Sequence, residues 1–432
     1  MRKACGRRRA AVAWGGWCLL GWLAAAPAAY LGEAVNSAKP RERAPKVSKA
    51  ESAALVTGAT RCALSLYHRQ GAERNLVYSP HSVSLALAMA YAGARGATAT
   101  QMAKVLGFTL PSERLHPALN AQALELAKRE SSAETGEAPF RLRIVNALWG
   151  QQGLTFLAPF LDLLAVNHGA GMRVVDFAAD PEAARRAVNA WVAAQTAERI
   201  KDLLGPGALT PQTSLVLTNA VYFQAAWQEP FKARDTKPGS FTCLDGERVR
   251  VPFMHQTESL PYAAGEGWQA VEVPYAGRQL ALLLVVPERG RFAKQDTELD
   301  AGKLRAITGA LRSNAVALSL PKFRLGSDLA LGKTLQAMGM TDAFDSKQAD
   351  FGGLCGTQKL FLTRVQHKAY ISVDEQGTEA AAATAAIGET ASAPKAKAGP
   401  VLLTIDRPFI LVLRDRPTGT VLFLGRVVNP AP

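Results

Sequence analysis

The sequence lacks the short motifs that mark the common classes of enzyme. It has no Gly-x-Ser-x-Gly elbow, no His-Glu-x-x-His, no phosphate-binding loop and no Gly-x-Gly-x-x-Gly fingerprint. Its six histidines are scattered and include no pair four residues apart, the spacing that places two rings on one helix face. The glycine cluster at residues 93–96 has the wrong spacing and is expected to end a buried helix. These absences predict a protein that is not an enzyme and has no cofactor and no metal site.

Cysteine is scarce, with five residues in a chain of 432. Two of them, Cys5 and Cys18, fall within the first 28 residues, and Cys62, Cys243 and Cys355 are far apart. No spacing among them is typical of a metal site. We expect free, partly buried thiols, and the alternative is one disulfide with one free thiol.

The positive charge is not gathered into a dense basic stripe. The formal net charge is +14, and five of these charges precede an apolar stretch near the N-terminus, at positions 2, 3, 7, 8 and 9. The remaining excess of about +9 makes the folded part moderately basic. Pairs such as Arg185 and Arg186 stand alone. A solvated basic surface is therefore favoured over a site for nucleic acid or glycosaminoglycan.

The N-terminus has the anatomy of an export signal. A basic stretch is followed by apolar residues 10–25 and by an Ala-x-Ala cleavage pattern at 26–28. We predict a signal peptide over residues 1–28, a flexible basic tail over 29–52 and a protein that is secreted to the periplasm or the extracellular space. An uncleaved N-terminal anchor is the alternative, although the apolar stretch is short for a spanning helix.

Residues 53–432 read as one large α+β domain, because helical and strand patterns alternate without a regular βαβ period. Ser79 and Pro80 predict the start of a buried helix, with Ser79 as N-cap. A second helix is expected over residues 183–204. The expected strands are residues 75–78, 215–225, 269–275, 280–286, 315–323, 368–374, 409–414 and 421–428.

Small residues fill the segment 374–386, about fifty residues before the C-terminus. In a strand, Thr378, Ala380, Ala382 and Thr384 would share one face, and none of them is charged or bulky, so this face can be buried in a sheet. Glu375, Glu379, Ala381 and Ala383 would share the other face, and Gly377 would give freedom at the pivot. Taken alone, the segment is equally typical of an alanine-rich helix or linker.

Several sequence blocks between residues 53 and 430 resemble the serpin family in order and spacing. The blocks are residues 75–84, 189–192, 200–204, 218–223, 320–323, 367–384 and 406–430. The resemblance implies three β-sheets, eight to nine helices and an exposed reactive-centre loop at about residues 375–403, in a monomer. The alanine-rich composition and the basic export signal are typical of a bacterial member.

The resemblance implies a suicide-substrate inhibitor of serine proteases. The loop would offer a peptide bond, the protease serine would form an acyl-enzyme, and the cleaved loop would insert into the main sheet and trap the covalent complex. We expect the new strand to form about a dozen backbone hydrogen bonds on its two edges, each contributing about 1 kcal/mol net. A non-inhibitory serpin-fold protein and an inhibitor of cysteine proteases are the alternatives.

Five residues resemble the positions that gate sheet opening in this family. Ser79, Ser82, Asn219 and His367 resemble its shutter cluster, and Trp227 resembles the tryptophan of its breach, at the top of the sheet. The simpler interpretations are a helix cap for Ser79, a satisfied core histidine for His367 and core packing for Trp227. The family usually has Lys-Gly where Gln224 and Ala225 stand, which puts the local turn in question.

The family's usual count from Gly377 places the reactive bond between Ala391 and Ser392. A small residue there suits an elastase-like or subtilisin-like protease, because a narrow pocket excludes large side chains. The loop is about six residues longer than in familiar members, and counting back from Pro408 places the bond near Lys395 or Lys397 instead, which suits a trypsin-like protease. We prefer Ala391, because the insertion length is set from the hinge, which is the segment 375–384 at the start of the loop.

Overall fold

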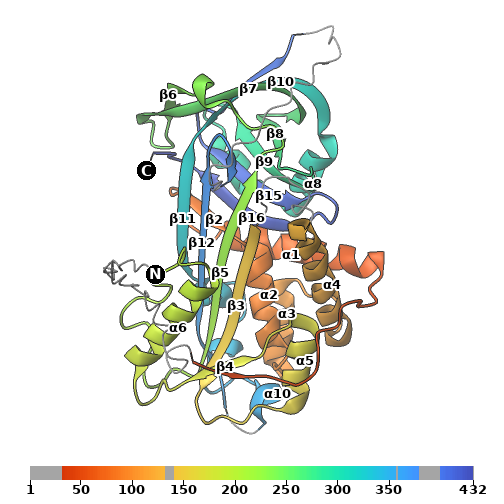
Figure 1. Cartoon of the computed structure of the whole chain (residues 1–432), viewed down its shortest axis with the longest axis vertical. Coiled ribbons are helices and arrows are strands. Elements are labelled where there is room, and N and C mark those ends of the chain that lie inside the picture. The colour runs from red at the N-terminus through yellow and green to blue at the C-terminus, as the bar shows by residue number, and fades with distance from the viewer. Residues whose placement is uncertain (1–31, 132–140, 357–358, 379–398, 432) are drawn as a thin grey trace, which may run out of the picture.

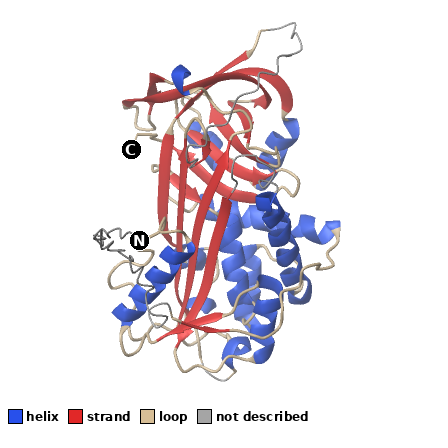
Figure 2. Cartoon of the chain, in the orientation of Figure 1, coloured by secondary structure: helices blue, strands red, loops and turns tan. Residues whose placement is uncertain are grey.

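The computed structural model describes residues 32–131, 141–356, 359–378 and 399–431. A long sheet runs along the vertical axis of Figure 1, with α1 to α5 against one side of it and α6 on the other. A second group of strands fills the upper part of the molecule, so that helices dominate the lower half (Figure 2). This α+β arrangement is the expected fold class.

The described residues contain ten α-helices, against the eight or nine expected, and three of the ten have six residues or fewer. Their bounds are α1 Lys49–Tyr67, α2 Pro80–Tyr91, α3 Gly96–Leu106, α4 Ser112–Ser131, α5 Ala158–His168, α6 Pro181–Gln195, α7 Phe292–Thr297, α8 Ala301–Ala310, α9 Gly332–Ala337 and α10 Gly352–Cys355.

Among the described residues, the main sheet has seven strands in the order β1-β4-β3-β5-β13-β12-β11. Its two central long strands, β5 and β12, are parallel to each other, and β3 and β11 flank them antiparallel. The bounds are β1 Glu33–Val35, β3 Arg141–Gln151, β4 Met172–Val175, β5 Leu215–Ala226, β11 Phe323–Ala330, β12 Leu362–Val373 and β13 Gly377–Thr378.

The other strands form one hydrogen-bonded sheet of nine, because the 18-residue β7 pairs with β6 and β10 along most of its length and with β8 at its end. The second and third expected sheets are thus continuous through β7. The bounds are β2 Leu76–Tyr78, β6 Lys237–Thr242, β7 Arg248–Gly265, β8 Trp268–Pro274, β9 Leu280–Pro287, β10 Arg312–Pro321, β14 Val401–Thr404, β15 Phe409–Asp415 and β16 Val421–Val427.

Helix α2 lies in the core beneath the main sheet, as its apolar sequence predicted. Ser79 caps it, because the Ser79 Oγ accepts a hydrogen bond from the Ser82 N–H at 3.2 Å, and Pro80 follows at the first helical position. The helix ends at Tyr91, before the glycine cluster, and every residue from Pro80 to Ala90 is buried. It forms a fixed base against which the sheet strands lie.

Helix α6 is shorter than expected. Asp180 caps its start, and it ends at Gln195 instead of continuing to residue 204. The side chain of Thr196 ends it by donating to the Val192 carbonyl and accepting from the Ile200 N–H, and Ala197 and Glu198 then adopt positive φ angles of 48° and 61°. These local hydrogen bonds outweigh the helical periodicity of residues 197–204.

The segment before α1 differs from the flexible tail expected over residues 29–52. Glu33–Val35 adds an edge strand to β4, and the Glu42 N–H donates to the Val166 carbonyl at 2.9 Å. Ser48 then caps α1, which begins at Lys49. Backbone pairing and capping hold this polar sequence on the body, although it has few apolar side chains to bury.

The described part of the chain contains three cysteines, Cys62, Cys243 and Cys355, and none of them forms a disulfide, as the first of the two expectations predicted. The predicted signal peptide at residues 1–28 lies outside the described residues. Within them, no helix combines the length and the apolar character needed to cross a membrane.

Candidate functional site

The candidate site is the boundary between β5 and β12, which we call the central seam. Its lower part is closed by direct parallel pairing from Leu215–Leu362 up to Tyr222–Tyr370. Parallel ladders are slightly less stable per residue than antiparallel ones. A strand that entered here would first break the hydrogen bonds between β5 and β12. These lost bonds must be subtracted from the bonds that the new strand forms, so the net gain of about a dozen hydrogen bonds expected from the sequence is too large.

At its upper end the seam is open and holds β13. Gly377 and Thr378 pair antiparallel with Ala226 and Ala225 of β5, and Thr378 also pairs with Val373 of β12. The Thr378 side chain is fully buried, and its hydroxyl lies 2.6 Å from the hydroxyl of Tyr275. The first residue of the predicted insertion face therefore already occupies the sheet.

Gly377 lies in close contact with β5. A Cβ atom at this position would lie 2.0 Å from the carbonyl oxygen of Ala225, so any larger residue would push the two strands apart. Ala225, where the family usually has glycine, pairs regularly with Thr378 inside β5. The turn that was in question at this position is a continuous strand.

The start of the hinge is held to neighbouring elements by an ion pair and by hydrogen bonds. A Glu375 carboxylate oxygen lies 2.7 Å from the Lys322 ammonium, and the other accepts from the Thr236 hydroxyl at 2.8 Å. The Lys322 ammonium helps to lower the pKa of Glu375, although partial burial opposes the shift. The Phe231 N–H donates to the Glu375 carbonyl at 2.9 Å. These contacts fix the direction in which the chain leaves β12.

Trp227 lies directly beside the hinge, at the end of β5. It is 1% exposed, and its ring stacks on Tyr275 with centroids 4.6 Å apart. Its indole N–H donates to the Asp374 carbonyl and its backbone N–H to the Gln376 carbonyl, both at 2.9 Å. Trp227 thus holds the backbone of the hinge by hydrogen bonds while its ring is fixed by stacking on Tyr275.

In the middle of the seam, the predicted shutter residues form one buried network. The Ser79 N–H donates to His367 Nε2 at 3.1 Å, and His367 Nδ1 donates to the Asn219 side-chain oxygen. The Asn219 amide donates in turn to the Ser82 hydroxyl and to the Asn146 oxygen. Because His367 and Asn219 are register partners on β12 and β5, the network closes the seam from both sides.

Sequence reasoning missed Asn146, which lies on β3 opposite Asn219. A lone asparagine within the apolar run 144–149 is the signal that could have found it, because an amide among the apolar residues of a strand needs hydrogen-bond partners. Burial of the ring lowers the pKa of His367 to about 3. Its ring is therefore neutral at pH 7, with Nε2 free to accept from Ser79.

The remaining predicted loop residues lie outside the described part of the chain. They are Glu379, Ala380, Ala381, Ala382, Ala383, Thr384, Ala391, Ser392, Lys395 and Lys397. The chain is described again from Gly399, and β14 then pairs parallel with β10 in the upper sheet. The two ends of the loop are thus fixed to different sheets. The described residues contain no group of three or more His, Cys, Asp or Glu side chains arranged to hold a metal ion.

These features define a class of protein: a large α+β domain whose main sheet holds the beginning of its own C-terminal loop between two parallel strands. Residues 57–430 match the profile of the family described as serpin (serine protease inhibitor). The chain belongs to the serpin family.

Relatives and solved structures agree with this assignment. A serpin-like protein of Thermococcus kodakarensis is 41% identical over 83% of this chain and 82% of its own length. The leukocyte elastase inhibitor of Bos taurus is 36% identical over 82% of this chain and 93% of its own length. The native-state crystal structure of tengpin, a thermophilic serpin, has a TM-score of 0.78 at 27% identity and covers 92% of this chain and all of its own.

Proposed function

We propose that this serpin is a monomeric, secreted suicide-substrate inhibitor of extracytoplasmic serine proteases, with an elastase-like or subtilisin-like target. The observation that carries the proposal is the antiparallel pairing of Gly377 and Thr378 between the parallel strands β5 and β12. A loop that continued in this direction would lie antiparallel to both neighbours along the whole seam. The binding partner would then be a protease that is held covalently, and no cofactor would take part.

Insertion would exchange one parallel ladder for two antiparallel ladders. The β5–β12 bonds below Tyr222 and Tyr370 would be lost, and bonds on both edges of the new strand would be gained. Each net backbone hydrogen bond contributes about 1 kcal/mol, and the more favourable antiparallel geometry and newly buried side chains add to this. The native fold would therefore store free energy that cleavage of the loop releases.

The released free energy would be used to disable the protease. Attack by the protease serine on the loop breaks one peptide bond and leaves the N-terminal half of the loop as an acyl ester on the enzyme. Insertion of that half would carry the tethered protease along the sheet. Deacylation depends on an intact triad and oxyanion hole, so displacing them stalls the reaction at the ester.

The choice of target rests on the reactive bond proposed between Ala391 and Ser392. A small residue before the bond suits the narrow primary pocket of an elastase-like protease. Two of the similar proteins, from Bos taurus and Homo sapiens, are named leukocyte elastase inhibitors, which is consistent with this target. Lys395 or Lys397 as reactive residue would direct the protein to a trypsin-like protease instead.

Incubation with purified proteases tests the proposal. We expect elastase to give an adduct that survives denaturing electrophoresis, and mass spectrometry of the released C-terminal fragment to find Ser392 as its first residue. The Ala391→Arg variant should lose the elastase adduct and form one with trypsin. Clean cleavage without an adduct by elastase, trypsin and a papain-like protease would favour the non-inhibitory alternative and contradict the proposal.

A further inference from the structure

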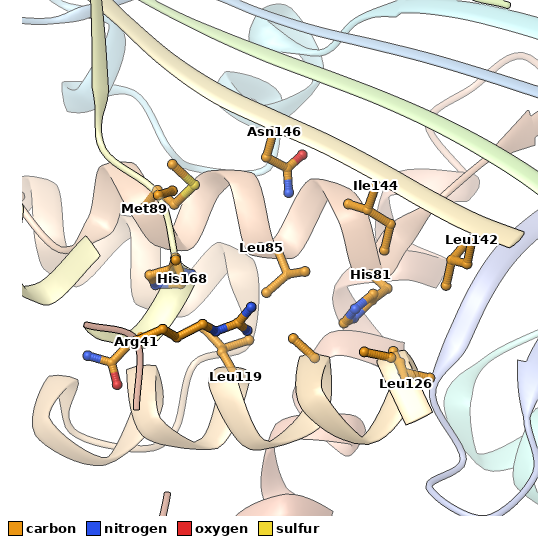
Figure 3. Close-up of a pocket in the computed structure, with 15 residues that line it drawn as sticks. Arg41, His81, Leu85, Met89, Leu119, Leu126, Leu142, Ile144, Asn146 and His168 are labelled. Carbon is orange, nitrogen blue, oxygen red and sulfur yellow. The ribbon is translucent and has the colours of Figure 1, made fainter. Parts of the chain in front are cut away.

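A cavity of about 330 Å³ lies between α4, α2 and β3 (Figure 3). Its floor is α2, which contributes the buried side chains of His81, Leu85 and Met89. Its walls are apolar residues of α4, such as Leu119, and of β3, such as Ile144. This volume lies at the lower end of the range of about 300 to 1,000 Å³ that is usual for small-molecule sites.

One cation points into this cavity, which is lined by polar as well as apolar side chains. Figure 3 shows the Arg41 guanidinium turned into the cavity between Leu85 and Leu119. Its Nε donates at 2.8 Å to the side-chain oxygen of Asn120, which is fully buried. The Asn120 amide donates in turn to the Glu42 carbonyl at 2.8 Å. The guanidinium is thus held in place from behind, which leaves its terminal amino groups directed at the cavity.

A buried polar atom without a partner lies further inside. The Nε2 atom of His81 has no hydrogen-bond partner among the described residues, and the side chain is 4% exposed. A buried imidazole nitrogen that remains unpaired carries a desolvation cost, which a bound polar group would remove. The floor therefore presents a second polar contact next to Leu85.

The charge of the cavity has one sign. None of the described residues that line it carries a carboxylate, so nothing there neutralises Arg41. Burial and the neighbouring Arg43 lower the pKa of Arg41, yet a guanidinium stays protonated at pH 7. A half-buried arginine interacts strongly with a carboxylate, because charge-assisted bidentate hydrogen bonds gain from a lowered local dielectric.

We propose that this cavity is a binding site for a small amphipathic monocarboxylate, of the class of medium-chain fatty acids. The carboxylate would accept hydrogen bonds from the Arg41 guanidinium at the rim. The apolar body would lie along Leu85, Leu119 and Ile144, and the His81 imidazole would bind a polar substituent or a single water beside it.

The site touches the gate of the sheet, because Asn146 of β3 both lines the cavity and joins the Ser82–Asn219 network. A ligand that fills the space between α4 and β3 binds the closed sheet in preference to the opened one. It stabilises the closed state in proportion to that differential affinity. This consequence rests on the proposed inhibitory function, whereas the binding itself does not.

Binding of decanoate to the native protein, measured by isothermal titration calorimetry, tests the proposal. We expect saturable binding of one decanoate per chain, and binding at least about tenfold weaker for decan-1-ol, which has the same chain without the charge. Arg41→Gln should weaken decanoate binding about tenfold or more. Arg43→Gln, which removes a neighbouring arginine that does not line the cavity, should leave the affinity unchanged.

A second variant distinguishes the contribution of the cavity volume to binding from the contribution of the Arg41 charge. Ala123→Leu fills part of the space from α4 and keeps Arg41, so it should also weaken decanoate binding. The site is refuted if decanoate and decan-1-ol bind alike, if neither saturates, or if Arg41→Gln and Arg43→Gln behave the same. Decanoate should also slow loop insertion after cleavage in the wild-type protein, and Arg41→Gln should abolish the slowing. If binding holds but no insertion occurs, the site stands and the proposed function falls.

Discussion

The upper and middle parts of the central seam are built on opposite principles. At the top, β5 and β12 are already apart, and Thr378 fills the gap with one hydroxyl contact to Tyr275 beside the stacked ring of Trp227. In the middle, the strands are paired directly, and His367 and Asn219 close them with hydrogen bonds to helix α2 and strand β3. The top is thus prepared for a new strand, and the middle resists it.

The difference shows where a barrier to insertion lies. A buried polar network is costly when only part of it is satisfied, since each lost partner leaves a desolvated group behind. An incoming loop meets little resistance beside Thr378, but it must then separate Asn219 from His367. In the proposed mechanism, therefore, the top sets the direction of insertion and the middle sets its rate.

The largest effect is expected from a charge at the top of the seam. Thr378→Arg would place a cation at a fully buried position, where the hydroxyl of Tyr275 is its polar neighbour. Burial of an unpaired charge costs several kcal/mol, so the hinge should leave the sheet. We expect the variant to be cleaved by elastase with almost no covalent adduct, as measured by quantitative denaturing electrophoresis.

The matched control is Gln376→Arg, which adds the same charge two residues earlier at an exposed position of the hinge. It should form adducts at the wild-type yield. If Thr378→Arg formed the covalent adduct at the wild-type yield, insertion would not pass through this position. The proposed difference between the top and the middle of the seam would then be wrong.

The middle of the seam should respond to pH. Burial holds the pKa of His367 at about 3, against an ordinary value of 6.5, so the unfolded chain binds a proton that the native protein does not. Its contribution to stability is therefore complete above pH 6.5 and is lost as the pH falls from 6.5 towards 3. His367→Gln should reduce the slope of unfolding free energy against pH by about 1.4 kcal/mol per pH unit in this window, as measured by urea denaturation.

Asn146→Ala is the matched control for this experiment. It removes another member of the same network but no titrating group, so it should lower stability by about 1–3 kcal/mol at every pH and leave the slope as in the wild type. An unchanged slope in His367→Gln would show that His367 titrates alike in the native and unfolded protein, which contradicts a closed, buried network.

The sequence predicted those features that depend on residues close together in the chain, such as the start of a helix or the turn of a hairpin. Ser79 and Pro80 specify the start of α2, and a hairpin between β8 and β9 follows from the turn residues at 276–278, where Gly277 and Arg278 adopt positive φ. The absence of bulky side chains showed that Thr378 can be buried in a sheet. It did not show that this residue is already there, because small side chains permit insertion without fixing its extent.

The features that were missed depend on contacts between distant segments. Asn146 gains its role only because β3 places it opposite Asn219, and the segment before α1 is held by strand and carbonyl partners that follow it by more than 100 residues. The end of α6 at Gln195 was missed for a local reason instead, because the Thr196 side chain competes with the helix for backbone hydrogen bonds. Periodicity in a single window carries none of this information.

The smallest effect is expected one register pair above the middle of the seam, where the segment after α6 contacts β5 and β12. Val192 and Ile200 pack on Ala220 of β5, and the Lys368 ammonium on β12 donates to the Lys201 carbonyl at 3.1 Å. Lys368→Met removes this partly exposed tie, which is worth about 1 kcal/mol or less, and should speed insertion by less than about fivefold. Stopped-flow fluorescence of a dye on the loop measures the rate, with Lys359→Met as the exposed lysine control. A slower rate in Lys368→Met would contradict this prediction. It would show that the hydrogen bond between Lys368 and Lys201 assists insertion, whereas a contact that must break before insertion can only slow it.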